Sequence, residues 1–400
     1  MSITPSPSVH TFKVWITDKT DIINILIALL SFNYNRYRQG EDDRVGLNKI
    51  TVELTTEPKK KPENSQLSFG KYFTDHMFIM DYDAGVGWHD PRIVPYQPIS
   101  LDPAAKVFHY GQTVFEGMKA YRTPEGPVLL FRPYKNLQRL NRSNARLSIP
   151  SIDENLVMDA LKQLIQVDKD WIPDEQGTSL YIRPFVISTQ ATLGVSPSEK
   201  YMFMIILSPV GSYYEEGINP VNIYVESEYV RAVTGGIGNA KTGGNYAAGL
   251  KAQQEATEKG YSQVLWLDGV HRKYIEEVGS MNVFFKVGDK VLTPALNGSI
   301  LDGVTRDSVI RLLKHWNITV EERTISIDEL VAAYREGTLE EAFGTGTAAV
   351  ISPIGELNWQ GDKLTLNGGN TGPLAARIYD FMTGLQRGLQ EDPFGWIEKL

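Results

Sequence analysis

The sequence predicts a mixed α/β protein of two domains, and two observations carry this expectation. From Ile50 onwards, short runs with the apolar pattern of strands are interspersed with stretches of helical periodicity. A segment rich in glycine, proline and charge separates two such regions, and 400 residues are enough for two cores. We therefore expect a small domain at 46–210, a linker at 211–220 and a larger domain at 221–400.

Residues 1–45 are expected to form an extension outside this fold. Their apolar run at 22–32, IINILIALLSF, is shorter than the roughly 20 residues that a membrane span needs. No small-residue cleavage site of a signal peptide follows it. We expect no membrane span, and two explanations stay open: a translation start assigned too far upstream, and a helix that tethers the chain to a membrane.

In the first domain, apolar runs predict strands and a 3.6-residue period predicts helices. The strands are expected at 50–54, 78–81, 128–131, 180–186 and 201–207. The helices are expected at 136–147, with a basic face of Arg139, Arg142 and Arg146, and at 153–168. The stretch 87–96, GWHDPRIVPY, reads as a loop because prolines interrupt it.

In the second domain, strands and helices alternate. We expect a hairpin at 283–292 that turns at Gly288 and Asp289, and a capping box at Ser326 and Glu329. The remaining strands are expected at 222–226, 263–267 and 318–322. The helices are expected at 245–260, with Asn245 as N-cap, and at 306–316, 327–334 and 373–389.

Composition excludes several classes of function. The net charge of −8 argues against a nucleic-acid partner, which requires a basic surface. The chain has no cysteine, so disulfides, thiolate metal sites and cysteine nucleophiles are excluded. Its six histidines show no ligand spacing, and we expect no metal site.

The glycine-rich stretch 234–249, TGGIGNAKTGGNYAAG, is the strongest functional candidate. Glycines on both sides of Lys241 let the backbone adopt φ > 0 and let a ligand approach closely. A lysine with few bulky neighbours suits work as an amine rather than as a solvated charge. Three interpretations are open for this stretch alone: a flexible surface loop, a nucleotide-binding P-loop, and a lysine that holds pyridoxal phosphate as a Schiff base.

The rest of the chain separates these interpretations. A P-loop needs a glycine directly before its lysine and a strand that leads straight into the loop, but Ala240 occupies the first position and the expected strand ends at Glu226. Pyridoxal phosphate needs a carboxylate for its pyridine nitrogen, backbone amides and an arginine for its phosphate, and a donor such as tyrosine for its phenolic oxygen. The chain offers each of these groups.

From about Phe69 to the C-terminus, more than three quarters of its length, the chain resembles the branched-chain amino acid aminotransferases, which are fold-type IV pyridoxal-phosphate enzymes. Eight motifs carry the resemblance and occur in the family's order. They are FGKYFTDHM, HYGQTVFEGMKAYR, LFRP, LYIRP, GNAKTGGNYA, EEVGSMNVFF, LDGVTR and GTGTAA. Residues 1 to about 45 match none of the family's motifs. The implied fold is a small N-terminal α/β domain and a larger C-terminal domain that binds the cofactor.

The resemblance implies a cofactor site. Lys241 would be the Schiff-base lysine and would move the proton at the substrate Cα, while Glu277 would pair with the pyridine nitrogen. The neighbouring Glu276 is expected to be an exposed charge at a strand end. Tyr246 would contact the phenolic oxygen of the cofactor. Its phosphate would be bound by Arg132, Val304, Thr305 and Thr347. Ser280 is a further implied cofactor contact.

The resemblance also implies a substrate site. The amides of Thr347 and Ala348 would bind the α-carboxylate, and Arg183 would bind the side-chain carboxylate of glutamate. An apolar pocket would be lined by Tyr110, Phe115, Tyr181 and Tyr213. Leu193 and Val195, with Tyr110, would reach across a dimer interface into the partner's pocket. Structural roles stay open for some of these residues, as core side chains for Phe115, Tyr181, Leu193 and Val195 and as an ion pair for Arg183.

The implied activity is reversible transfer of the amino group of leucine, isoleucine or valine to 2-oxoglutarate, which gives a branched 2-oxo acid and glutamate, in a cytoplasmic homodimer. Three alternatives stay open: a D-amino acid aminotransferase or aminodeoxychorismate lyase of the same fold, a P-loop phosphotransferase, and a non-catalytic vitamin-binding protein. The apolar pocket and Arg183 favour the branched-chain activity. A vitamin-binding protein would not need both Lys241 and Glu277.

Overall fold

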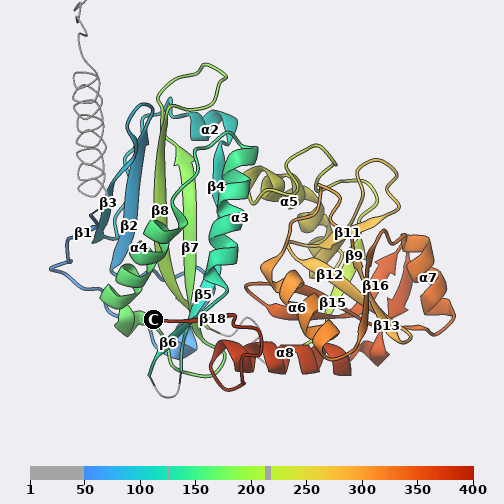
Figure 1. Cartoon of the computed structure of the whole chain (residues 1–400). Helices are drawn as coiled ribbons and strands as arrows, with labels where there is room; N and C mark the ends of the chain where they lie inside the picture. Colours follow the sequence, from blue (N-terminus) through green and yellow to red (C-terminus); the bar gives the residue numbers. More distant parts are fainter. Residues whose placement is uncertain (1–48, 124–125, 212–217) are drawn as a thin grey trace, which may run out of the picture. The chain divides into compact units, whose positions relative to one another are not determined.

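The computed structural model describes residues 49–123, 126–211 and 218–400, and two sheets organise them (Figure 1). The expected extension at 1–45, Tyr213 and most of the expected linker lie outside the described residues. Residues Ile50–Leu400 form one compact unit. The mixed α/β class is confirmed, whereas the expected domain boundaries stay a prediction.

The first sheet has nine strands in the described part of the chain, in the order β1-β3-β2-β8-β7-β5-β6-β18, with β4 paired to β7. Its neighbouring strands are antiparallel except β1 and β3. The strands are β1 (Thr51–Val52), β2 (His76–Asp83), β3 (Gly87–Pro95), β4 (Thr113–Phe115), β5 (Met118–Arg122), β6 (Val128–Phe131), β7 (Ser179–Ser188), β8 (Lys200–Val210) and β18 (Ile397–Lys399).

Two amphipathic helices, α3 (Pro133–Arg146) and α4 (Glu154–Val167), cover one face of this sheet. Their apolar side chains join those of β2, β7 and β8 in one buried cluster. The Asp153 side chain accepts hydrogen bonds from two backbone amides of the first turn of α4, so this helix begins where the sequence predicts. The short helix α2 (Lys106–Tyr110) packs near β7.

The second sheet also has nine strands among the described residues, in the order β11-β10-β9-β16-β15-β12-β13-β14, with β17 paired to β16. It is mixed, since β9 runs parallel to β10 and to β16, and β13 parallel to β14. The strands are β9 (Val221–Val225), β10 (Gln263–Leu267), β11 (Ile275–Val278), β12 (Asn282–Val287), β13 (Lys290–Pro294), β14 (Thr319–Arg323), β15 (Leu339–Gly346), β16 (Val350–Trp359) and β17 (Asp362–Thr365).

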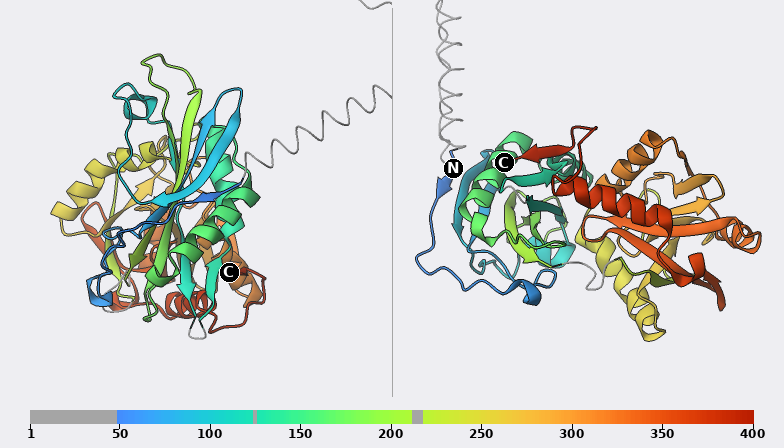
Figure 2. Two further views of the ribbon diagram at one scale, coloured as in Figure 1. Left: turned by 90° about the vertical axis from the view of Figure 1, so that its left-hand side faces the viewer. Right: turned by 90° about the horizontal axis from the view of Figure 1, so that it is seen from below.

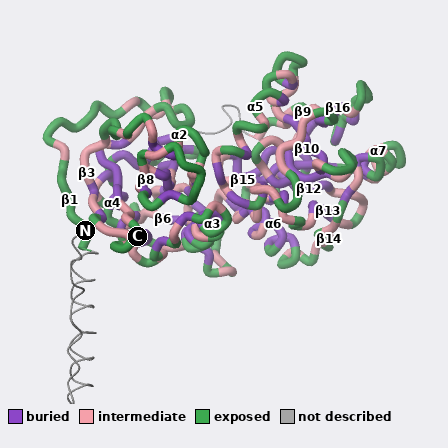
Figure 3. Tube along the Cα trace, turned by 90° about the horizontal axis from the view of Figure 1, so that it is seen from above, coloured by how far each residue is buried: buried purple, intermediate pink, exposed green. Residues whose placement is uncertain are grey.

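Helices lie on both faces of this sheet, whose strands are mostly buried (Figure 3). One face packs against α7 (Ile327–Arg335), whose N-cap Ser326 accepts a hydrogen bond from the Glu329 amide as the capping box predicts. The other packs against α6 (Val304–His315) and α8 (Pro373–Gln386). Helix α5 (Gly243–Glu258) contributes alanines to a smaller cluster with β10.

Two features differ from the expectations. The stretch 87–96 contains the strand β3 rather than a loop. Pro91 falls where the pairing with β2 shifts register and the ladder needs no N–H, and Pro95 is the last residue of the strand. The N-cap of α5 is Thr242 and not Asn245. After α8 the chain returns to the first sheet, where β18 pairs with β6 (Figure 2).

Candidate active site

Lys241 lies in the loop before α5, and hydrogen bonds on both sides hold its backbone. Its N–H donates to the Ser143 hydroxyl (2.9 Å) and its carbonyl accepts from the Phe115 N–H (3.0 Å). The Asn245 side chain donates to two carbonyls of the loop just before the lysine. These contacts place Lys241 Nζ 3.0 Å from the Tyr246 hydroxyl and 5.0 Å from the centre of the Phe115 ring. These contacts hold the amine in one position.

A cavity of about 320 Å³ surrounds this amine. That volume suits a small-molecule ligand. Both halves of the chain contribute to its wall, among them β4, β7, α3, α5, α6 and the turn between β15 and β16. The predicted site residues that line it are Phe115, Tyr181, Arg183, Lys241, Tyr246, Ser280, Val304, Thr305, Thr347 and Ala348.

The N-terminus of α6 forms one end of the cavity. Val304 and Thr305 are its first residues and follow the N-cap Gly303, so free backbone amides face this region. A helix N-terminus favours a negatively charged group such as a phosphate. Arg139, on α3, lines the same cavity and adds a positive charge.

Arg139 is held by a buried partner. Its guanidinium donates two hydrogen bonds to the Glu116 carboxylate (2.7 and 2.9 Å) and one to the Asp302 carbonyl (3.0 Å). Burial, the largest single effect, would raise the pKa of Glu116, but Arg139, Lys241 and Asn136 together hold that pKa below its usual value. The pair therefore stays charged, and Arg139 keeps one orientation.

Arg132, which the resemblance assigns to the phosphate, does not line this cavity. It is 7 % exposed, and its guanidinium donates to the Ser308 hydroxyl (2.6 Å) and to the Asp307 carboxylate (2.5 Å). It also stacks on Trp396, 4.9 Å from the ring centre. These contacts tie α6 to the start of α3 and to the C-terminal segment, so the geometry gives Arg132 a structural role.

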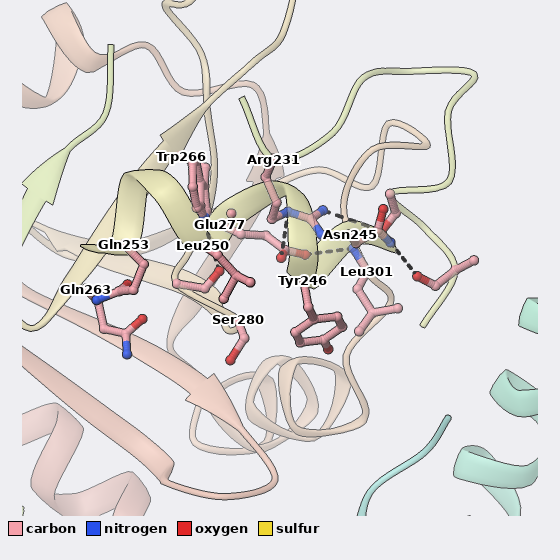
Figure 4. A pocket seen from close by; sticks show the side chains of 14 residues that line it. Arg231, Asn245, Tyr246, Leu250, Gln253, Gln263, Trp266, Glu277, Ser280 and Leu301 are labelled. Carbon is pink, nitrogen blue, oxygen red and sulfur yellow. Dashed lines mark hydrogen bonds and ion pairs between the residues drawn. The ribbon is translucent and has the colours of Figure 1, made fainter. Parts of the chain in front are cut away.

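Glu277 lies beside the cavity, in an adjoining space of about 170 Å³ that shares Tyr246 and Ser280 with it (Figure 4). Its carboxylate accepts from the Leu301 N–H (2.8 Å) and lies 3.2 Å from Arg231 Nε. Burial raises the pKa of Glu277, and Arg231 opposes that shift. A buried acid with a single guanidinium partner can serve as a fixed anion toward a cationic ligand atom.

The expectation for Glu276 is wrong, because this side chain is buried and not exposed. It is 3 % exposed, and its carboxylate accepts hydrogen bonds from Ser299 Oγ and from Asn297 Nδ2. Successive strand residues point to opposite faces, which separates Glu276 from Glu277. Glu276 therefore holds the segment around Ser299 and does not face the cavity.

The turn between β15 and β16 closes the cavity with Thr347 and Ala348. The Thr347 hydroxyl donates to the Gly117 carbonyl (3.2 Å), and Val350, just after the turn, has a φ of +62°. A β-branched residue in this region is strained, so the surrounding contacts must enforce the conformation of the turn. Two polar atoms that line the cavity, Thr345 Oγ1 and Arg183 Nε, are buried without a hydrogen-bond partner in the described structure.

Aromatic residues and one guanidinium form another part of the wall. Arg183 Nη2 donates to the Tyr181 hydroxyl (3.0 Å), and the guanidinium lies 4.8 Å from the centre of the Phe115 ring. A Cβ at Gly117 would approach the Tyr181 hydroxyl to 2.1 Å, so only glycine allows this ring to close the wall. The wall thus presents both apolar surface and a positive charge.

Tyr110, Leu193 and Val195 lie away from this cavity. Their side chains are 42 %, 64 % and 85 % exposed, and the Tyr110 hydroxyl donates to the Leu193 carbonyl. They form one exposed group at α2 and the loop before β8. None of them lines the cavity of its own chain, and Tyr213 is not among the described residues.

Sequence reasoning missed Arg139. The basic face of its helix is visible in the sequence, but only the packing of α3 against Glu116 shows which of its arginines points into the cavity. The P-loop interpretation is wrong, because β9 ends at Val225, far before the lysine, and α5 begins at Gly243.

The described residues offer neither a metal site nor a membrane-spanning helix. No group of three or more His, Asp or Glu side chains there could hold a metal ion. In the same part of the chain, no helix combines the length and apolar character that crossing a bilayer requires.

Known proteins match this chain over most of its length. A family model described as Amino-transferase class IV matches residues 113–357. Branched-chain-amino-acid aminotransferase 2 of Bacillus subtilis is 65 % identical over 88 % of this chain and 97 % of its own length. Branched-chain-amino-acid transaminase 1 of the same organism is 59 % identical over 87 % of this chain and 98 % of its own.

Solved structures agree with these sequences. The branched-chain amino acid aminotransferase of Escherichia coli superposes with a TM-score of 0.68 at 28 % identity, over 81 % of this chain and 98 % of that one. The branched-chain amino acid aminotransferase of T.th., solved with pyridoxamine 5′-phosphate, has a TM-score of 0.66 at 27 % identity, over 80 % and 97 % of the two chains. With the amine, helix terminus and carboxylate described above, these matches establish that the chain belongs to the class IV aminotransferases.

Proposed function

We propose that the protein is a branched-chain L-amino acid aminotransferase that uses pyridoxal 5′-phosphate. It transfers the amino group of leucine, isoleucine or valine to 2-oxoglutarate and forms the branched 2-oxo acid and glutamate. The identities of 65 % and 59 % to two branched-chain aminotransferases support this substrate class. The combination of an apolar wall and a guanidinium in one cavity supports it independently.

The residues of the cavity and of the space beside it fit this cofactor. The amine of Lys241 matches the aldehyde of the cofactor, and the buried carboxylate of Glu277 matches its pyridine nitrogen. The N-terminus of α6 matches its phosphate. The Thr345 hydroxyl, which has no hydrogen-bond partner in the described structure, leaves room for one more contact. Lys241 would hold the cofactor covalently, with Tyr246 and Ser280 beside it. The amides of Val304 and Thr305, the Thr347 hydroxyl and Arg139, in place of Arg132, would hold the phosphate.

The chain's own residues then have separate tasks. Bound pyridoxal phosphate supplies an electron sink for the charge that remains when the substrate loses its Cα proton. Lys241, released by the substrate amine, takes that proton and returns it. The Tyr246 hydroxyl at 3.0 Å orients the lysine amine, and Glu277 keeps a negative charge at the pyridine nitrogen so that the nitrogen stays protonated.

The substrate would lie between the turn and the aromatic wall. The amides of Thr347 and Ala348 would bind its α-carboxylate, and Phe115 and Tyr181 would pack on a branched side chain. Arg183 would pair with the second carboxylate of glutamate or 2-oxoglutarate. Tyr213 would complete the apolar wall.

The exposed group of Tyr110, Leu193 and Val195 would enter the cavity of a second copy, which makes the protein a homodimer. Large exposed apolar side chains that gather on α2 and on the loop before β8 are typical of an interface. The protein would work in the cytoplasm, as expected for an enzyme of amino-acid metabolism.

The observation that carries the proposal is the 3.0 Å contact of Lys241 Nζ with Tyr246 in a cavity closed by the N-terminus of α6. The purified protein should be yellow and should lose its visible absorbance with borohydride. With leucine and 2-oxoglutarate it should form glutamate. A colourless protein to which no pyridoxal phosphate binds would contradict the proposal.

A further inference from the structure

A second cavity lies behind the turn that closes the active site. Its volume is about 320 Å³, and it is lined by β5, by α8, which Figure 1 shows in red, and by the turn itself. Ala348 and Ala349 line both this cavity and the catalytic one. Exposed residues such as Gln390 and Leu389 also line it, so solutes can enter from the surface.

Lys119 supplies a positive charge to this cavity. Its Nζ donates a hydrogen bond of 2.7 Å to the Ala348 carbonyl, and in the described ranges no carboxylate forms an ion pair with it. An ammonium has three donors, and this contact uses one of them. Burial lowers the pKa of the Lys119 ammonium to about 8, as expected for a cation that lacks an anionic partner.

Two further polar groups in the wall have no partner. Ser179 is 1 % exposed and Gln386 is 6 % exposed, and both line this cavity. Within the described structure, neither Ser179 Oγ nor Gln386 Oε1 makes a hydrogen bond. Buried polar atoms are almost always paired, so two such atoms in the wall that also holds Lys119, an ammonium with only a carbonyl as its partner, indicate a place for a polar ligand.

The chemistry of the wall selects the ligand. A cation and a hydroxyl donor suit a carboxylate, whereas the Gln386 amide oxygen accepts from a donor such as an ammonium. Asp380, on the same helix, and Arg387, directly after Gln386, also line the cavity and contribute one negative and one positive charge. Val350 and Leu389 contribute apolar surface. We propose that this cavity binds a free α-amino acid, with its carboxylate at Lys119 and Ser179 and its amino group at Gln386.

An amino acid bound in the second cavity would affect the catalytic cavity through the hydrogen bond between Lys119 and Ala348. Lys119 holds the carbonyl of Ala348, whose turn is proposed to bind the substrate carboxylate. A ligand that takes over a donor of Lys119 changes the support of that turn, and the two cavities then affect each other's affinity reciprocally. This coupling rests on the proposed function, whereas binding in the second cavity does not.

The test uses radiolabelled 2-aminoisobutyrate, an amino acid without a Cα proton, which cannot be transaminated. Equilibrium dialysis is performed on holoenzyme reduced with borohydride, in which the cofactor is fixed to Lys241. We expect saturable binding of one molecule per chain. Lys119→Met should weaken it at least tenfold, and Ser179→Ala and Gln386→Leu at least threefold. Lys135→Met, an exposed lysine on α3, should leave it unchanged.

The variants also separate a binding site from unpaired polar atoms without function. Thermal unfolding identifies variants that fail to fold, and the two neutral substitutions keep the test valid if Lys119→Met is one of them. No saturable binding, or equal binding in all folded variants, would overturn the proposal. If sodium chloride displaces the bound 2-aminoisobutyrate as effectively as L-alanine does, the cavity is a simple anion site. That result would also overturn the proposal. Failure of borohydride to bleach the protein concerns the proposed function alone, since the same dialysis can be run on unreduced protein.

Discussion

Arg183 Nη2 donates a hydrogen bond of 3.0 Å to the hydroxyl of Tyr181, two residues earlier on β7. Residues two apart on a strand point to the same face, so the strand itself places a cation against an aromatic wall. The guanidinium also lies 4.8 Å from the centre of the Phe115 ring. One pocket can therefore present apolar surface to leucine and a positive charge to glutamate.

This arrangement predicts that Arg183 binds the side-chain carboxylate of the acidic substrate. Arg183→Lys and Arg183→Ala should weaken glutamate and 2-oxoglutarate by about 1.5 kcal/mol or more, about tenfold, because a charge-assisted contact is lost. The leucine half-reaction should change much less. Single-turnover rates with each amino donor measure the difference, with Arg335→Lys, exposed on α7, as the control. Equal losses for both donors would mean that Arg183 only supports the wall.

Lys241→Ala should abolish nearly all turnover and the visible absorbance of the covalently held cofactor. The phosphate contacts remain, so dialysis should still show bound pyridoxal phosphate. Lys251→Ala, an exposed lysine on α5, is the matched control and should keep full activity. Full turnover in Lys241→Ala would refute the proposed function.

Glu277→Gln should fold and bind pyridoxal phosphate but should transaminate far more slowly. A neutral amide cannot keep the pyridine nitrogen protonated, so the negative charge at Cα loses its sink. Single-turnover rates with leucine measure the loss. Glu276→Gln is the neighbouring comparison, and it should lower stability more than the rate, since Glu276 binds Ser299 on the other face of β11. An unchanged rate in Glu277→Gln would remove this role.

The two candidate phosphate ligands can be separated by experiment. Arg139→Lys should raise the dissociation constant of pyridoxal phosphate much more than Arg132→Lys, because only Arg139 lines the cavity. Arg139→Lys also loosens a buried ion pair with Glu116, so thermal unfolding must be followed in parallel. The reverse order of the two dissociation constants would support the assignment made from the motif LFRP.

The environment of Asp268 predicts that the free energy of unfolding depends on pH. Its carboxylate accepts hydrogen bonds from four backbone N–H groups in the turn between β10 and β11. Strand β11 carries Glu277. Burial alone would raise the pKa of Asp268, but these four donors outweigh burial and lower it from 3.8 to about 2. Because the pKa is lower in the folded chain, the stabilisation is complete above 3.8 and is lost as the pH falls toward 2.

Asp268→Asn should therefore lower the free energy of unfolding at neutral pH by about 1.5–3 kcal/mol, the scale of hydrogen bonds to a charged group. Chemical denaturation of both proteins between pH 7 and pH 3 measures the difference, which should shrink at the acidic end. Asp289→Asn is a control in the hairpin turn between β12 and β13. A difference that is constant with pH would contradict the role of the charge.

Local patterns in the sequence correctly predicted most elements. The apolar period and the Asp153 cap predict α4 to within one residue at each end, and the turn residues Gly288 and Asp289 predict the β12–β13 hairpin. The prediction failed at β3, where a bulge in the pairing with β2 accommodates Pro91. Such accommodation depends on the neighbouring strand, which a local pattern does not contain.

The identity of the reacting amine and of its acid partner follows from the order and type of residues, because a glycine-lined lysine and a carboxylate meet chemical needs that few other residues can meet. Which arginine lines the cavity, and which of two adjacent glutamates lies in the space beside it, depends on contacts between segments far apart in the chain. Arg139 is oriented by Glu116 and Asp302, Arg132 by Asp307 and Trp396, and Glu277 by Arg231. A side chain's direction is set by the partners that satisfy its charge, and folding alone brings those partners together.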